Sequence, residues 1–169
     1  MTTLQRNAEV ARKTGETDIT IRVNLDGTGK TEVATGIGFF DHMLTLLGRH
    51  SLIDLAVAAR GDLSVDGHHT VEDIGIVLGQ AVDKALGNRA GITRYGTAAV
   101  PMDETLATAV VDLGGRPYLV YDAEYPCDRA GDFDVELVRE FLIALANNLK
   151  ANIHIHVPSG AIPKDGPSA

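Results

Sequence analysis

The same order of segments occurs twice along this chain, and that order constrains its fold more than any other feature. Each half has extended segments, then a segment with helical spacing, then another extended segment. The extended segments cover residues 18–25, 31–35, 52–59, 97–101, 106–113, 118–123 and 151–157, and the helical ones cover 39–47 and 134–148. Apolar residues at every second position predict half-buried strands, whereas steps of three and four predict amphipathic helices. We therefore predict an α+β protein made of two like units.

Turn residues separate these segments. The stretch 26–29, Asp-Gly-Thr-Gly, predicts a β-hairpin that joins the strands over 18–25 and 31–35. Residues 114–117, Gly-Gly-Arg-Pro, predict a turn in the second half.

One further helix is predicted in the first half only. It follows the stretch 66–73, Asp-Gly-His-His-Thr-Val-Glu-Asp, and fades at residues 87–91. Its apolar positions are Ile74, Val77, Leu78, Ala81, Val82, Ala85 and Leu86. Asp66 and Gly67 supply a cap and an entry turn, and Glu72 and Asp73 are expected in the first turn, where carboxylates suit the helix dipole.

Imidazole groups are concentrated around the start of this helix. Four of the six histidines are His42, His50, His68 and His69. His68 and Glu72 are four residues apart and share a helix face, whereas His69 lies about 100° further round and is expected to meet Glu72 or Asp73. Two imidazoles and a carboxylate predict half of a two-metal site, and imidazole and carboxylate donors without thiolate suit manganese, iron or zinc. The alternative is a solvated helix start with incidental histidines.

Composition limits the partners. A net charge of −8 argues against nucleic acid and anionic membranes, although a few local cations would suffice for a phosphorylated small molecule. Cys127 is the only cysteine, which excludes an internal disulfide and fits a reducing compartment. No apolar run has the length of a membrane span, and residues 1–13 contain no signal-peptide core. We therefore expect a cytoplasmic location.

Long motifs between about residue 6 and residue 157 resemble those of the imidazoleglycerol-phosphate dehydratase family. They are 15–17 Gly-Glu-Thr, 35–44 Thr-Gly-Ile-Gly-Phe-Phe-Asp-His-Met-Leu, 61–62 Gly-Asp, the stretch 66–73, 94–96 Arg-Tyr-Gly, 101–104 Pro-Met-Asp-Glu and 115–117 Gly-Arg-Pro. The resemblance implies duplicated β-β-α-β-α half-domains of the ribosomal protein S5 domain 2-like type, with antiparallel sheets and helices packed on one face. Residues 1–91 would be the first repeat and 92–157 an incomplete second repeat, in one structural domain.

The resemblance also implies an activity. The family's hydro-lyase removes water from imidazole glycerol phosphate to give imidazole acetol phosphate in L-histidine biosynthesis. It uses two Mn2+ ions per active site, and neighbouring subunits of a homo-oligomer, a 24-subunit assembly, share each site.

Carried over position by position, the resemblance assigns roles to individual residues. His42, His68, His69 and Glu72 match first-repeat metal ligands, and Glu140 falls at a second-repeat ligand position. Glu16 matches a catalytic carboxylate that contacts substrate and could move a proton. The same four ligands and His50 would line the substrate pocket. Arg94 and Arg116 would bind the phosphate, for which guanidinium groups are suited.

The end of the chain departs from the family. Residues 158–169 contain three prolines and two glycines and are predicted to be a disordered tail. The second His-His motif and its glutamate would fall at Lys164, Asp165 and Ser168, so the final helix of the second repeat is expected to be missing. From this we expect a truncated or frameshifted end and impaired activity. Two alternatives are a non-catalytic relic of the fold and a two-metal hydrolase that uses metal-bound hydroxide.

Overall fold

The computed structural model describes residues 6–158. The elements in chain order are β1 (Asn7–Lys13), β2 (Thr17–Asn24), β3 (Thr31–Ala34), α1 (Gly38–Ser51), β4 (Asp54–Gly61), α2 (His68–Leu86), β5 (Tyr95–Met102), β6 (Thr105–Asp112), β7 (Tyr118–Ala123), β8 (Arg129–Ala130), β9 (Phe133–Asp134), α3 (Leu137–Leu149) and β10 (Asn152–Val157). None of the helices in this part of the chain is long and apolar enough to span a bilayer.

Two four-stranded sheets have the same topology. Their strand orders are β1-β2-β4-β3 and β5-β6-β10-β7. In each sheet the first two pairs are antiparallel, and the third pair, β3 with β4 or β7 with β10, is parallel. The predicted α+β class with sheets rich in antiparallel pairs is therefore confirmed.

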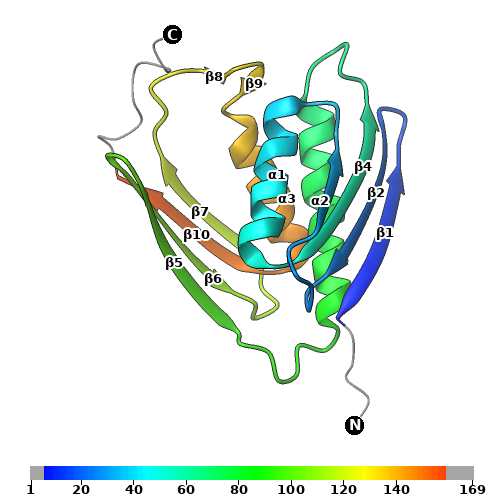
Figure 1. The fold of residues 1–169 in the computed structure, drawn as a ribbon, viewed down its shortest axis with the longest axis vertical. Coiled ribbons are helices and arrows are strands. Elements are labelled where there is room, and N and C mark those ends of the chain that lie inside the picture. The colour runs from blue at the N-terminus through cyan, green and yellow to red at the C-terminus, as the bar shows by residue number, and fades with distance from the viewer. Residues whose placement is uncertain (1–5, 159–169) are drawn as a thin grey trace.

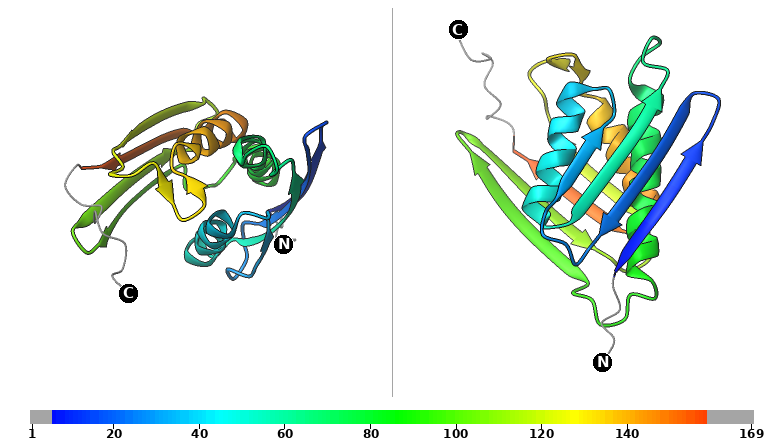
Figure 2. Two further views of the ribbon diagram at one scale, coloured as in Figure 1. Left: turned by 90° about the horizontal axis from the view of Figure 1, so that it is seen from above. Right: turned by 45° about the vertical axis from the view of Figure 1, so that its right-hand side comes forward.

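The three helices lie between the two sheets, which open apart like a V (Figures 1 and 2). On one side, α2 packs against β1 and β2. Ile19 and Ile21 of β2 and Ile74 of α2 are fully buried in this core. On its other side, α2 packs against α3 so closely that a Cβ atom at Gly79 would lie 2.8 Å from the carbonyl oxygen of Leu145. Glycine therefore permits the close approach of the two helices.

The strand pairing corrects two expectations. β1 was not predicted, because residues 7–13 carry charged side chains and alternate only between exposed and half-buried positions. It gives the first unit one strand more than the expected β-β-α-β-α order. The predicted hairpin over residues 26–29 is wrong, because β4 lies between β2 and β3 in the sheet.

The helix boundaries also differ from the predictions. α1 extends to Ser51, so His50 lies inside its last turn rather than beyond it. α3 begins at Leu137, since Asp134 pairs with Arg129 in the small β8–β9 ribbon. α2 begins at His68, so its first turn contains no acidic residue, and Glu72 and Asp73 follow in the second turn.

The inner face of the second sheet is only partly covered. Every residue of β5 is exposed, including Val100 at 61% and Met102 at 70%. α2 covers β1 and β2, but within residues 6–158 no helix packs along the equivalent strands β5 and β6. The final helix of the second repeat, which was expected to be missing, would follow β10, beyond the described residues. The predicted tail from Ser159 onward, with Lys164, Asp165 and Ser168, lies outside the described residues.

Candidate functional site

Several predicted site residues gather at one end of the molecule, where α1 and α2 both begin (Figure 1). A Cβ atom at Gly67, just before α2, would lie 3.4 Å from Cδ1 of Ile37, just before α1. The β1–β2 turn, which carries Glu16, reaches the same place because Thr17 bonds to Asp73 of α2. We call this end the histidine end, and it contains Glu16, His42, His68, His69 and Glu72.

His68 and Glu72 lie side by side on α2. Nε2 of His68 is 3.7 Å from Oε2 of Glu72, as the four-residue spacing predicts, and both side chains are nearly half exposed. The rings of His68 and His69 are 6.1 Å apart and nearly perpendicular. The two imidazoles therefore face different directions, and each is accessible to a ligand from outside the chain.

His69 meets a different carboxylate from the one expected. Its Nδ1 is 3.0 Å from Oδ2 of Asp62, which follows β4, and among the described residues it forms no hydrogen bond with Glu72 or Asp73. The hydrogen bond to Asp62 raises the pKa of His69, with smaller contributions from the charges of Asp62, Glu16 and Asp66, while desolvation opposes the shift. The negative charge of Glu16 therefore acts on His69.

Asp73 has a structural role at this end. It is 7% exposed, and its carboxylate accepts hydrogen bonds from Nε of Arg12 at 2.9 Å and from the hydroxyl of Thr17 at 2.5 Å. Thr17 belongs to the turn that carries Glu16. That turn is closed by Oγ1 of Thr14, which accepts hydrogen bonds from the backbone N–H groups of both Glu16 and Thr17. Asp73 therefore ties the Glu16 turn to α2.

The donor types at the histidine end suit a divalent ion, but one chain brings too few together. Within residues 6–158 there is no group of three or more His, Cys, Asp or Glu side chains that could hold a metal ion. His42 is exposed on α1, and Glu140 on α3 lies near Arg139 at 3.8 Å. Imidazole and carboxylate groups are ligand types that suit manganese. A complete metal site would need further ligands besides the side chains of the histidine end.

The two arginines predicted to bind phosphate lie at the opposite end, where α2 finishes. Arg89, just after α2, donates to the carbonyl oxygen of Leu113, whose N–H donates to the carbonyl oxygen of Arg94. Arg94 also forms two bonds with Asp112, and the charge of Arg116 acts on the same carboxylate. Because α2 has 19 residues, about 28 Å separates its two ends. We call this the arginine end, and no substrate-sized molecule could touch both ends of one chain.

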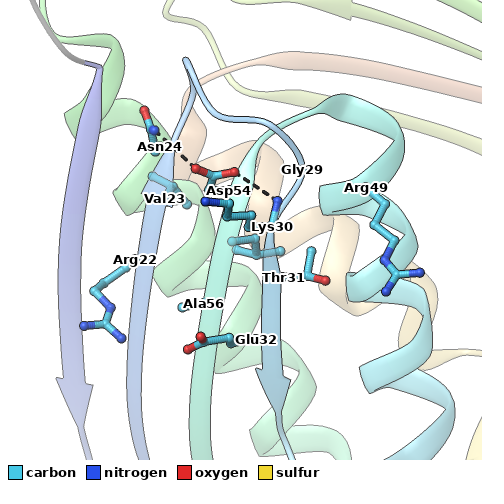
Figure 3. Close-up of a pocket in the computed structure, with 11 residues that line it drawn as sticks. Arg22, Val23, Asn24, Gly29, Lys30, Thr31, Glu32, Arg49, Asp54 and Ala56 are labelled. Atoms are coloured by element: carbon cyan, nitrogen blue, oxygen red, sulfur yellow. Dashed lines mark hydrogen bonds between the residues drawn. The ribbon is translucent and has the colours of Figure 1, made fainter.

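A hollow of about 560 Å³ lies on the first sheet, and the predicted site residues do not line it. Figure 3 shows Asp54 at its centre, hydrogen-bonded to Asn24 and to the backbone of Lys30, with the side chains of Arg22 and Arg49 to either side. The backbone N–H groups of Thr28 and Lys30 hold the pKa of Asp54 below its ordinary value. The carboxylate in this hollow therefore serves to fix the loop between β2 and β3.

Sequence reasoning missed two contributors to the histidine end. Asp62 stands in a quoted motif, but nothing in the local spacing indicates that it reaches His69. Arg12 belongs to the unpredicted strand β1. Only the pairing of distant segments brings either residue to α2.

The two like units define a duplicated α+β protein with three helices between two mixed sheets. Comparison with known proteins then shows that the chain belongs to the imidazoleglycerol-phosphate dehydratase family, whose model matches residues 35–165.

Relatives with this name are similar over most of the chain. The protein from Acetivibrio thermocellus is 54% identical over 158 residues, which are 94% of this chain and 81% of the relative. The one from Rhodopseudomonas palustris strain TIE-1 is 59% identical over 155 residues, covering 92% of this chain and 79% of the relative.

Solved structures agree with this assignment. The structure of imidazoleglycerol-phosphate dehydratase from Staphylococcus aureus superimposes with a TM-score of 0.82 at 39% identity and covers 92% of this chain and 85% of that one. The Pyrococcus furiosus structure gives 0.75 at 36% identity, with coverages of 89% and 80%. The resemblance found in the sequence motifs is confirmed.

Proposed function

We propose that this chain is a hydro-lyase that converts imidazole glycerol phosphate to imidazole acetol phosphate. The observation that carries the proposal is its identity of 54–59% to proteins named imidazoleglycerol-phosphate dehydratase over more than nine-tenths of its length. Histidine biosynthesis is the pathway in which such an enzyme acts. The single cysteine supports a cytoplasmic location.

We further propose that His42, His68, His69, Glu72 and Glu140 hold Mn2+. The support is the donor chemistry of these side chains and the accessibility of both imidazoles on α2. A bound divalent ion would act as a Lewis acid on the substrate imidazole. In this proposal Glu16, on its turn beside His69, takes the proton from the substrate carbon, and the hydroxyl group leaves as water. Arg94 and Arg116 bind the phosphate.

Each site is proposed to combine the histidine end of one chain with the arginine end of another. The separation of about 28 Å along α2 supports this arrangement, since one chain cannot place both ends on one substrate. The incomplete metal cluster within residues 6–158 supports it as well. A closed homo-oligomer, a 24-subunit particle in the proposal, would repeat the same contact at every site.

The direct test is turnover of imidazole glycerol phosphate with added Mn2+, with a chelator-treated sample as the control. Formation of the ketone product only in the presence of metal supports the proposal. Metal binding without product would instead support a non-catalytic relic of the fold. The rate also decides whether activity is impaired, because a rate equal to that of a longer relative would contradict impairment.

A mixing experiment tests the shared site. His69→Ala disables the histidine end and Arg94→Ala disables the arginine end, so each variant alone should be inactive. If sites combine ends from two chains, co-refolding equal amounts should restore roughly a quarter of the wild-type activity, because random pairing makes that share of sites intact. No recovery from a mixture that assembles normally would contradict the shared site.

A further inference from the structure

Asp62 lies in a turn whose backbone is held at both ends. Gly61 before it is the last residue of β4 and pairs with Thr17 of β2. A Cβ atom at Gly61 would lie only 1.9 Å from Oγ1 of Thr70 on α2, so the strand end and the helix are in close contact. After it, the N–H of Val65 donates to the carbonyl oxygen of Asp62 at 2.7 Å. The position of Asp62 relative to the first turn of α2 is therefore fixed.

The side chain of Asp62 is directed at one nitrogen of His69. Its Oδ2 atom lies 3.0 Å from Nδ1, and the Asp62 side chain is 24% exposed whereas that of His69 is 47% exposed. The second carboxylate oxygen, Oδ1, is buried and has no hydrogen-bond partner among the described residues. An ionised carboxylate can only accept hydrogen bonds, so the bond requires a hydrogen on Nδ1. In neutral imidazole this leaves the lone pair on Nε2.

The neighbouring histidine lacks such a contact. Nε2 of His68 is 3.7 Å from Glu72, which is beyond hydrogen-bond distance. This difference between His68 and His69 matters because a metal ion binds the imidazole nitrogen that has no hydrogen. The hydrogen bond made by one ring nitrogen fixes the hydrogen there and leaves the other nitrogen free to bind the metal.

We propose that Asp62 is a positioning residue that holds His69 as the Nδ1–H tautomer and presents the lone pair of Nε2 to a divalent cation. The cation-binding part rests on the proposed function, in which His69 is a metal ligand. The tautomer part depends only on the hydrogen bond. Asp62 touches neither the cation nor the substrate, and its effect is transmitted through the ring of His69.

Two measurements on the full chain test this inference. The first records the imidazole ¹⁵N shifts of His69 by NMR in metal-free protein, at a pH where the ring is neutral. The second measures Mn2+ affinity by calorimetry. Asp62→Ala should abolish the preference for Nδ1–H and weaken Mn2+ binding about 10- to 100-fold, the usual effect of removing a carboxylate behind a ligating histidine. Asp62→Asn should weaken binding less, because its amide oxygen can still accept the hydrogen bond.

Asp66→Asn is the matched control. The charge of Asp66 acts on His69, but its Oδ1 accepts the backbone N–H of His68, and the amide oxygen of asparagine can do the same. This variant should leave the His69 tautomer unchanged and Mn2+ affinity within about threefold.

The outcomes separate this inference from the proposed function. An unchanged His69 tautomer in Asp62→Ala overturns the inference, as does a loss of Mn2+ affinity no larger than that of Asp66→Asn. If the wild-type chain does not bind Mn2+, the metal proposal fails while the tautomer measurement still decides the role of Asp62. Should Asp62→Ala not fold, the NMR comparison uses Asp62→Leu, whose side chain has similar size and no acceptor, and an unchanged His69 tautomer in that variant overturns the inference.

Discussion

Replacing Asp73 of α2 by alanine should cost far more stability than replacing Asp18, an exposed aspartate on β2. Asp73 accepts one hydrogen bond from Thr17, which is 4% exposed, and one from Arg12, whose side chain is 40% exposed. In Asp73→Ala the buried hydroxyl loses its charged partner, at a cost of about 1.5–3 kcal/mol. The half-exposed guanidinium regains water and adds only about 0.5–1 kcal/mol. We expect a total loss of about 2–4 kcal/mol in the free energy of unfolding.

The measurement is urea unfolding followed by circular dichroism, with Asp18→Ala as the control. Asp18 forms an ion pair with Lys13 at 2.8 Å, but these side chains are 55% and 76% exposed. Removing such a pair should cost less than about 1 kcal/mol. Asp73→Asn keeps one acceptor and should fall between the two. If Asp73→Ala and Asp18→Ala have the same unfolding free energy, the buried link between β1, β2 and α2 does not have the strength argued here.

Two further predictions concern the packing and the pH dependence of stability. Gly79→Ala should destabilise the protein by about 1–3 kcal/mol in urea unfolding, because its Cβ would press on the backbone of α3. Gly38→Ala on α1 is the control, since its Cβ has open space and the substitution should be neutral or slightly stabilising. Equal effects of the two substitutions would contradict the close contact between α2 and α3. Burial raises the pKa of Asp83, but its bonds with Lys150 and Arg89 outweigh this and lower it below the ordinary value. Its contribution is therefore present above the unfolded pKa and is lost as the pH falls through the lower folded pKa. The difference in unfolding free energy between wild type and Asp83→Asn should therefore shrink as the pH falls below the ordinary aspartate pKa of about 3.9, and a constant difference would refute the assignment.

The sequence was sufficient for the helices whose apolar face is continuous. The three- and four-residue steps of α2 predicted buried positions correctly, since Ile74, Val77 and Ala81 are fully buried. The α1 and α3 segments were also found, with ends displaced by a few residues. In these cases local periodicity and tertiary packing favour the same structure, and no distant partner is needed to recognise the element.

Strand pairing could not be predicted in the same way. The composition of residues 26–29 is that of a hairpin, yet β2 lies between β1 and β4, and β4 comes after α1 in the chain. The edge strand β1 lacks a strong apolar pattern, because one face meets α2 only partly and the other meets solvent. Which strand lies beside which depends on how the helix covers the sheet, and no short stretch of sequence records that.

The candidate site shows the same limit at the level of single contacts. The spacing of His68 and Glu72 is a property of one helix, so the sequence predicts their proximity. The pair His69 and Asp62 depends on the close contact between the end of β4 and α2, which Gly61 permits. Asp62, in the turn before α2, is thus the carboxylate that contacts His69, where helix spacing alone predicts Glu72 or Asp73.

The length of α2 explains why the predicted site residues lie in two separate groups. In the first unit the strand after α1 leads directly into α2, whose start carries the histidines, and α2 ends beside the turns that carry the arginines. A single rigid helix therefore holds the two groups of charged side chains at opposite ends, and no movement of a loop could bring them together within one chain. Any variant that keeps the fold but prevents two copies from meeting should lose phosphate binding and turnover at the histidine end while keeping the tautomer of His69. The hydrogen bond between Asp62 and His69 is made within one chain, and so it remains when the chains are separated.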